Sequence, residues 1–305
     1  MVEVADRLHL VVRSSGTIYD ALWDLETPLL ETERDLLATP AVSRLHGVVH
    51  AGASALTTAQ TYSRLEHTLG VFSLAAHFAP DDRELRAASL LHDVGHLPLS
   101  HTLEGIGGLD HHAVGHTQIA SSAVADVLQA GGLDAVAVAE TAFGLRPTLL
   151  RPGRGRLGLD HLDSFVRAGR VHGWLRIQPP DILDALYVAA GELDGSPAAG
   201  DELARLMVNT ARFHAHPLNV GPTALVRRAF RRLIAADPDA ADKLTAATDV
   251  ELWATLLRHQ ATRQEIRQIL AQPDGAVVAA SDASRHTPST REPLLSHAMP
   301  VRHTL

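Results

Sequence analysis

Stretches of helix-forming residues, separated by Pro and Gly, run through most of the sequence and constrain the fold more than any other feature. They cover approximately residues 29–39, 41–51, 63–79, 83–94, 112–131, 134–144, 157–171, 181–191, 201–214, 221–236 and 249–271. Pro and Gly residues such as Pro40, Pro80 and Pro179-Pro180 punctuate these stretches. No regular alternation of strands and helices accompanies them, so the pattern predicts an all-α fold rather than an α/β fold.

The two ends of the chain depart from this pattern. Alternating apolar residues between Leu8 and Val12 precede a Ser14-Ser15-Gly16 turn, which predicts a short β-hairpin near residues 7–19. From about Gln272 the chain becomes polar and loses its period, which predicts a flexible tail. The predicted organisation is a hairpin segment (1–20), a helical domain (21–200), a helical extension packed on that domain (201–272) and the tail (273–305).

Composition excludes several classes of protein. The chain has 305 residues, of which 46% are hydrophobic and 20% charged, and this is enough to bury a sizeable core. No run approaches the roughly 18 consecutive apolar residues of a membrane span, and the acidic N-terminus lacks the apolar segment of a signal peptide. The absence of cysteine fits a cytoplasmic protein without disulfides. The net charge of −8 argues against general nucleic-acid binding.

Two segments place histidines on apolar helices. In residues 63–71, Arg64 and His67 share one helix face, because three residues nearly complete a turn. In residues 90–101, an apolar helix carries the adjacent pair His92-Asp93 at its C-terminal end. A buried carboxylate without a partner is costly, so the second segment favours a functional role for this pair.

A third segment adds further carboxylates. On the predicted helix over 157–171, four polar residues form one stripe at helical spacing: Asp160, Asp163, Ser164 and Arg167. Histidines and aspartates together suit a divalent metal, because imidazole binds borderline metals and carboxylates favour Mn or Fe over a purely soft site. Such a metal lowers the pKa of bound water from about 15.7 to roughly 7 and so produces hydroxide at neutral pH.

These three segments resemble the HD-domain metal-dependent phosphohydrolases, whose hallmark is a spaced H…HD…D set. The closest similarity is to their deoxynucleoside triphosphohydrolase branch. Its patterns S-R-x-x-H-x-x-x-V, L-x-H-D-x-G-H-x-P-x-S-H and D-x-x-D-Y-x-x-R-D are similar to residues 63–71, 90–101 and 160–168. The resemblance covers about residues 5–240. It implies an HD-domain helical bundle that hydrolyses a phosphate ester of a small phosphorylated substrate, a nucleotide above all.

The resemblance also implies roles for individual residues. It implies one divalent ion per chain, with Mn, Fe, Co, Ni, Zn and Mg not distinguished, held by His67, His92, Asp93 and Asp160. It further implies that His96 and His116 act near the scissile phosphate and that His101 supports the site. We expect Arg64 and Arg167 to bind phosphate through paired hydrogen bonds, with Arg64 close to the reacting group.

The sequence departs from this branch at positions that contact substrate. The branch's Asp-Lys pair is Asp160-His161 here, its tyrosine is Ser164 and its final aspartate is Ala168. Thr117 follows His116 where the branch usually has glutamate. His161 and Ser164 are therefore predicted to line a substrate pocket that differs from the standard one. We expect a nucleotide with fewer phosphates, or another phosphate ester, rather than a standard deoxynucleoside triphosphate.

Two other function classes stay open beside hydrolysis. A di-iron HD-type oxygenase would need further ligands, and the available histidines are His96, His111, His112 and His116. A non-catalytic nucleotide-binding HD module is disfavoured by the complete ligand set. A zincin protease is rejected, because Asp93 stands where its H-E-x-x-H motif needs glutamate. One metal ion per chain would favour hydrolysis of the triphosphohydrolase kind, whereas two would favour the alternatives. A homo-oligomer is compatible with the sequence.

Overall fold

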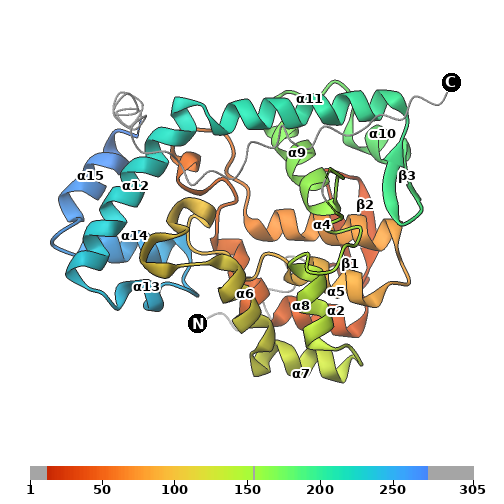
Figure 1. Ribbon diagram of the computed structural model, residues 1–305, viewed down its shortest axis with the longest axis horizontal. Coiled ribbons are helices and arrows are strands. Elements are labelled where there is room, and N and C mark those ends of the chain that lie inside the picture. Colours follow the sequence, from red (N-terminus) through yellow and green to blue (C-terminus); the bar gives the residue numbers. More distant parts are fainter. Residues whose placement is uncertain (1–11, 154, 274–305) are drawn as a thin grey trace.

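The computed structural model describes residues 12–153 and 155–273, and the described part is mostly helical (Figure 1). Its α-helices are α2 (Glu31–Ala38), α3 (Pro40–Ser43), α4 (Arg64–Phe78), α5 (Arg83–Leu91), α6 (His111–Ala120), α7 (Ser122–Ala130), α8 (Ala135–Ala142), α9 (Leu159–Val171), α10 (Pro179–Asp184), α11 (Pro197–His214), α12 (Pro217–Ala236), α13 (Ala240–Lys243), α14 (Asp249–Arg258) and α15 (Arg263–Ala271). Short 3-10 helices are η1 (Arg44–Gly47), η2 (Gly52–Leu56), η3 (Ser100–Leu103) and η4 (Ile106–Gly108). The all-α prediction is confirmed. The predicted tail lies outside the described residues from residue 274 onward.

A β-hairpin lies near the N-terminus, as predicted, but further along the chain. Strand β1 (Thr17–Asp20) pairs antiparallel with β2 (Leu25–Pro28), whereas the sequence pointed to residues 7–19. A turn does occur at Gly16, which has a φ of 76°. The segment after it begins the observed hairpin instead of ending the predicted one. The residues predicted to form the preceding strand lie mainly outside the described residues.

A second hairpin replaces part of a predicted helix. Residues 181–191 were expected to form one helix, but α10 ends at Asp184, and β3 (Leu186–Ala189) pairs with β4 (Glu192–Gly195). The turn between these strands uses Ala190 and Gly191, whose φ angles are 51° and 78°. Two consecutive residues with positive φ match the twist of a two-residue hairpin. This local turn outweighs the weak helix preference of a short segment.

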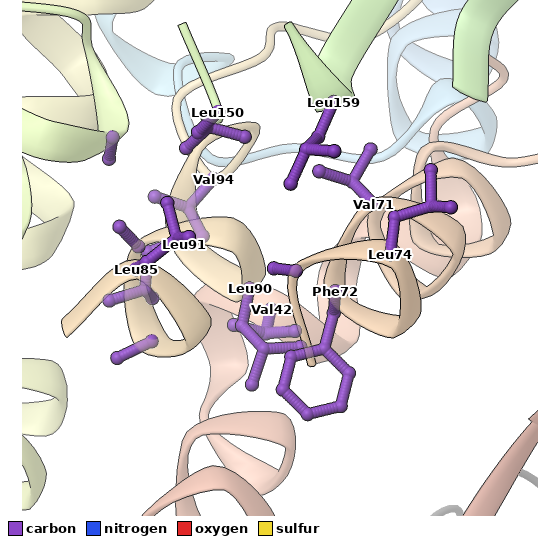
Figure 2. Packing of buried hydrophobic residues seen from close by; sticks show 14 of the residues in the cluster. Val42, Val71, Phe72, Leu74, Leu85, Leu90, Leu91, Val94, Leu150 and Leu159 are labelled. Carbon is purple, nitrogen blue, oxygen red and sulfur yellow. The ribbon is translucent and has the colours of Figure 1, made fainter. Parts of the chain in front are cut away.

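The larger hydrophobic core lies where α4, α5, α8 and α9 pack together. Helix α4 contacts both α5 and α9, and α5 also contacts α8. Figure 2 shows Phe72 of α4 next to Leu90 of α5, and Leu74 and Leu91 belong to the same cluster; all four are fully buried. Burial of each such side chain contributes about 1.5–3 kcal/mol. This packing fixes the two helices that carry the histidines of the first and second sequence segments.

A second core joins the C-terminal helices to the loops that follow α5. Helices α12 to α15 gather at one end of the molecule (Figure 1), where Phe230 of α12 belongs to the same buried cluster as Leu97 and Leu103. Arg44 donates hydrogen bonds to the carbonyl of His96 at 2.7 Å and to the carbonyl of Ala247 at 2.8 Å. The segment that follows His92-Asp93 is therefore held between the two cores.

Helices α7 and α8 follow each other at the edge of the molecule opposite α11 (Figure 1). No single helix among the described residues is long and apolar enough to cross a membrane. These two helices reach that length and composition only as a pair, and they bend by 109° at the break between them.

Candidate metal centre

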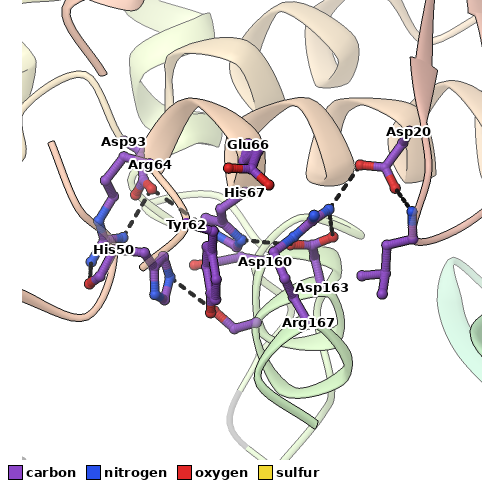
Figure 3. A network of polar contacts seen from close by, with 12 residues as sticks. Asp20, His50, Tyr62, Arg64, Glu66, His67, Asp93, Asp160, Asp163 and Arg167 are labelled. Carbon is purple, nitrogen blue, oxygen red and sulfur yellow. Dashed lines mark hydrogen bonds and ion pairs between the residues drawn. The ribbon is translucent and has the colours of Figure 1, made fainter. Parts of the chain in front are cut away.

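Three elements bring histidine and aspartate side chains to one buried point (Figure 3). His67 lies on α4, His92 follows the last residue of α5, and Asp160 lies in the first turn of α9. One ligand atom from each of these residues lies within 4.8 Å of the other two. We call His67, His92 and Asp160 the first cluster.

The start of α4 is fixed by a reciprocal cap. The Ser63 hydroxyl accepts a hydrogen bond from the Glu66 backbone N–H at 3.2 Å, and the Glu66 carboxylate accepts one from the Ser63 N–H at 3.4 Å. Such a capping box defines where the helix begins. It places His67 one turn into α4, on the side that faces α9.

The hydrogen-bond partners of the Nδ1 atoms of His67 and His92 determine that the Nε2 atom of each ring faces the cluster. His67 Nδ1 lies 2.7 Å from Oδ2 of Asp163, and His92 Nδ1 lies 2.8 Å from the carbonyl oxygen of Ser89. Burial opposes ionisation of Asp163, but Arg167 and His67 lower its pKa to about 2, so its carboxylate accepts only. Both Nδ1 atoms therefore carry protons. The two Nε2 atoms face each other at 3.4 Å.

The distances within the first cluster fit a divalent cation. Oδ1 of Asp160 lies 3.2 Å from Nε2 of His67 and 3.9 Å from Nε2 of His92. Neighbouring ligands of an octahedral ion with bonds of about 2.1 Å lie roughly 3 Å apart. Without a cation, burial opposes a second proton on His67, but hydrogen bonds to Asp160 and Asp163 outweigh it and raise its pKa to about 9. A cation would take the place of that proton.

Asp93 flanks the first cluster. Its Oδ1 lies 3.5 Å from Nε2 of His92, and its Oδ2 lies 3.9 Å from Nε2 of His67. Arg64 donates to Oδ2 at 2.9 Å, and His96 Nε2 lies 3.1 Å from Oδ1. Burial opposes ionisation, but Arg64 holds the pKa of Asp93 well below its usual range. The four residues of the predicted ligand set thus lie together, with Asp93 slightly further out.

Residues 64–168 match the family model described as the HD domain. This range holds the first cluster, Asp93 and the helices that carry them. The chain contains an HD domain.

Curated relatives match parts of this chain. The chain is 36% identical over 94 residues to uncharacterized protein MJ1154 of Methanocaldococcus jannaschii and 37% identical over 90 residues to uncharacterized protein YwfO of Bacillus subtilis. These matches span 21% of each of those proteins. A longer match, 27% identical over 226 residues, joins 72% of this chain to 68% of uncharacterized protein YdhJ of Bacillus subtilis.

The two arginines predicted to bind phosphate are buried and donate hydrogen bonds to aspartates, Arg64 to Asp93 and Arg167 to Asp163. Arg64 is 5% exposed and also donates from Nε to the Ser100 hydroxyl at 2.9 Å. Arg167 is 7% exposed and donates to Asp163 at 2.9 Å and to Asp20 at 2.8 Å. Because buried carboxylates need a counter-charge, both guanidinium groups are used to hold aspartates. Both side chains are thus paired with aspartates and have little surface open to a ligand.

The predicted catalytic histidines separate in space. His96 is buried beside Asp93, and the His101 ring lies 4.6 Å from the His96 ring. His116 is exposed and packs on Phe143, with 4.5 Å between ring centroids. His111, the first residue of α6, stacks on His96 instead, at 4.6 Å and an interplanar angle of 16°. The structure therefore brings His96, His101 and His111 together and leaves His116 apart.

A glycine allows α6 to approach this closely. A Cβ on Gly95 would meet the backbone carbonyl oxygen of His111 and the backbone of Gly115. Backbone atoms cannot move aside as a flexible side chain can. The glycine of the H-D-x-G-H motif in the HD domain is thus explained by the contact that sets His111 beside His96.

The remaining predicted substrate residues lie on α9. The Ser164 hydroxyl is 3.3 Å from Nε2 of His50, and the His50 ring lies 4.8 Å from the His67 ring. His161 is exposed, with its ring 5.7 Å from that of Phe165. His50 lies outside the three sequence segments that predicted the site. No motif marks it, and only the fold places it beside the cluster.

Arg151 was also missed by sequence reasoning. It lies in the loop before α9, and its Nη2 is 3.0 Å from Oδ2 of Asp160. The side chain is 24% exposed, yet its Nε is buried without a hydrogen-bond partner among the described residues. The segment around it is rich in Pro, Gly and Arg and predicts only a loop. Arg151 is thus an arginine beside the first cluster that is still partly open to solvent.

Proposed function

We propose that this chain is a metal-dependent phosphohydrolase that acts on a phosphate ester bond of a nucleotide or nucleotide-like substrate. The observation that carries the proposal is the first cluster. Two buried imidazole Nε2 atoms, each with its Nδ1 engaged from behind, face the carboxylate of Asp160. The match to the HD domain supports the same class of enzyme.

The residues around the cluster prepare it for a divalent ion. Such an ion, when bound, supplies a Lewis acid that lowers the pKa of water and stabilises charge on phosphoryl oxygens. Asp160 contributes negative charge, and Asp163 keeps the His67 ring in the orientation that exposes Nε2. Arg64 holds Asp93 against the cluster. These outer contacts orient the ligands before any ion arrives.

Arg151 is the residue best placed to bind the phosphoryl group. Its guanidinium lies on the side of Asp160 that is partly exposed, and its buried Nε lacks a hydrogen-bond partner among the described residues. Arginine donates paired hydrogen bonds to phosphate oxygens. We assign to Arg151 the phosphate contact that the sequence alone had given to Arg64 and Arg167.

The substrate preference follows from the residues on α9. Ser164 is small and His161 carries no permanent charge, in positions where similar enzymes have tyrosine and lysine. A site rejects analogues strongly only when the polar groups that read the substrate are present. We therefore expect better activity on nucleoside monophosphates, or a related phosphate ester, than on the four standard deoxynucleoside triphosphates.

The test is a phosphate-release screen with the full chain and the variant Asp160→Asn. Nucleoside mono-, di- and triphosphates are each assayed with Mn, Fe, Co, Ni and Mg. We expect release with at least one metal and about a thousandfold loss in Asp160→Asn. Asp126→Asn, which changes an exposed aspartate of α7, is the matched control. Equal release by the wild type and Asp160→Asn would contradict the proposal. Efficient triphosphate release from the standard deoxynucleotides would contradict only the substrate preference.

A further inference from the structure

The loop that leads from α5 towards α6 contains a turn that is unfavourable for its residues. Leu99 and Ser100 have φ angles of 54° and 53°, in the left-handed region. Residues with a Cβ rarely adopt this region, and two in succession are rarer still. Both residues are buried, at 3% and 1% exposure. Contacts with other parts of the chain must therefore hold the turn in place.

A single carboxylate from α14 provides one of these contacts and joins the turn to a second loop. Asp249, the first residue of α14, accepts a hydrogen bond from the Leu99 N–H on Oδ1 at 2.6 Å and one from the Val49 N–H on Oδ2 at 2.8 Å. Each oxygen thus serves a different loop. A charged acceptor forms a stronger hydrogen bond with a backbone N–H than a neutral one does. The two loops are consequently tied together by one side chain that lies far from both in the sequence.

An arginine ties the segment before the turn to the residues that precede α14. Arg44 donates from Nη2 to the His96 carbonyl at 2.7 Å and from Nη1 to the Ala247 carbonyl at 2.8 Å. The backbone also approaches closely here, because a Cβ on Gly47 would meet the Thr248 side chain at 2.8 Å. The start of α14 is therefore packed against the HD-domain side of the molecule on both sides of the Asp249 contacts.

From the turn, polar contacts continue to the residues that flank the first cluster. The Ser100 hydroxyl donates to the Val49 carbonyl at 2.5 Å and accepts from Nε of Arg64 at 2.9 Å. Arg64 also donates to the His50 carbonyl at 3.4 Å. Its Nη1 donates to Oδ2 of Asp93 at 2.9 Å (Figure 3). The two loops joined by the α14 carboxylate are therefore the same two that hold the Arg64 guanidinium against Asp93.

We infer that Asp249 is a positioning residue for the candidate metal centre, and that α14 completes this centre from outside residues 64–168. Without the carboxylate, the left-handed turn loses its charged acceptor, and Ser100 no longer has a fixed place from which to hold Arg64. Asp93 then loses its orientation beside the first cluster. Outer contacts that orient ligands affect metal affinity about 10–100-fold. The effect of Asp249 on metal affinity is independent of the proposed function, whereas its effect on turnover rests on that function.

Metal titration of full-chain variants tests this inference. The chain is stripped with chelator and titrated with Co²⁺, and the binding that Asp160→Asn abolishes identifies the first cluster. We expect Asp249→Ala to weaken this binding about tenfold and to lower kcat with KM unchanged. Asp249→Asn should recover part of the loss, because an amide oxygen can still accept one of the two N–H groups.

Glu251→Ala is the matched control for a merely structural role of α14. Glu251 caps this helix by accepting from the Thr248 N–H at 2.7 Å, so its removal loosens the same helix start and leaves the Asp249 carboxylate present. Hydrogen exchange measured by mass spectrometry reports the turn directly. Peptides that contain Leu99 should exchange faster in Asp249→Ala than in Glu251→Ala. Circular dichroism checks the fold of each variant.

The outcomes separate this inference from the proposed function. Co²⁺ binding and kcat that are equal in both Asp249 variants and in Glu251→Ala would overturn the positioning role and leave the proposed function standing. Weaker Co²⁺ binding in Asp249→Ala, in a chain whose wild type releases no phosphate, would support the positioning role and contradict the proposed function. If Asp249→Ala does not fold, unchanged Co²⁺ binding in Asp249→Asn would overturn the inference. No Co²⁺ binding in the wild type would overturn both.

Discussion

The first cluster and a neighbouring group of three histidines, His96, His101 and His111 (the histidine triad), both lie next to Asp93, yet the protein supports them differently. Behind His67, Asp163 also accepts hydrogen bonds from Trp23 at 2.8 Å and from Arg167 at 2.9 Å, all in the buried core. Among the described residues, the carboxylate that contacts the His111 ring is that of Glu104, whose side chain is 27% exposed. The carboxylate that supports the first cluster is therefore buried in the core, whereas the one that supports the triad is partly exposed to solvent.

The two groups also differ in charge. The first cluster includes the carboxylate of Asp160 and has Asp93 next to it, so it neutralises much of the charge of a divalent ion. The triad offers only imidazoles. Affinity for a divalent ion should therefore be higher at the first cluster. The comparison predicts that changes near the first cluster affect stability and metal retention together, while changes near the triad affect both less.

The largest expected effect is on the free energy of unfolding. It comes from removing the carboxylate that contacts the Nδ1 atom of a histidine, which is Asp163 at the first cluster and Glu104 at the triad. Asp163→Ala leaves Arg167 buried with one partner fewer and should lower the free energy of unfolding by about 3–5 kcal/mol. Glu104→Ala removes a partly exposed contact and should cost less than about 1 kcal/mol. Urea unfolding of both variants measures the difference. Equal losses would show that the two groups are supported alike.

Arg151→Gln should lower kcat/KM by about 100-fold, because the phosphate loses a charged, paired donor. Arg151→Lys should recover only part of this, since an ammonium group cannot donate in the same paired geometry. Bound metal should stay as in the wild type in both variants. Arg156→Gln is the matched control, because this arginine belongs to the same loop but pairs with Glu192 at 3.0 Å. An unchanged kcat/KM in Arg151→Gln would move the phosphate contact elsewhere, with the triad as the next position to examine.

The affinity of the first cluster for metal should depend on pH. Burial opposes the second proton of His67, but Asp160 and Asp163 raise its pKa to about 9 without a cation. A metal must displace that proton. Below about pH 9, binding thus releases one proton, and the apparent affinity rises about tenfold per pH unit before it levels off. Calorimetric titrations of the full chain with metal between pH 6 and 8 measure this dependence, and a flat profile would exclude proton displacement at His67.

Several features of the fold and site could be predicted from the sequence because they are local. Apolar helices that carry single polar residues indicate where His67, His92 and Asp160 face the core, and Pro and Gly mark most helix ends. The hairpin after α10 was missed because its Ala190-Gly191 turn lies inside a segment of ordinary helix formers. Arg151 was missed because loop residues have no period that predicts which way they point.

The structure places His111 beside His96, where the sequence had predicted His116, and the reason is geometric. The Asp110 carboxylate accepts hydrogen bonds from the N–H groups of His112 and Ala113 at 2.8 Å and 3.1 Å, which fixes His111 as the first residue of α6. Five residues later the helix has rotated by about 140° beyond one full turn. His116 consequently points away from the face that carries His111. A sequence pattern identifies the helix, but the cap decides which histidine lies beside His96.

The smallest expected effect concerns Ser164, whose hydroxyl is 3.3 Å from Nε2 of His50. A neutral hydrogen bond contributes about 0.5–1.5 kcal/mol, and this distance is long for one, so Ser164→Ala should change kcat/KM by no more than about threefold. Ser164 is not one of the ligands in the first cluster, so bound metal should stay as in the wild type. Kinetics and metal analysis of the same preparation provide the check. Loss of metal in Ser164→Ala would mean that the first cluster depends on this hydroxyl of α9 as well as on the carboxylates behind it.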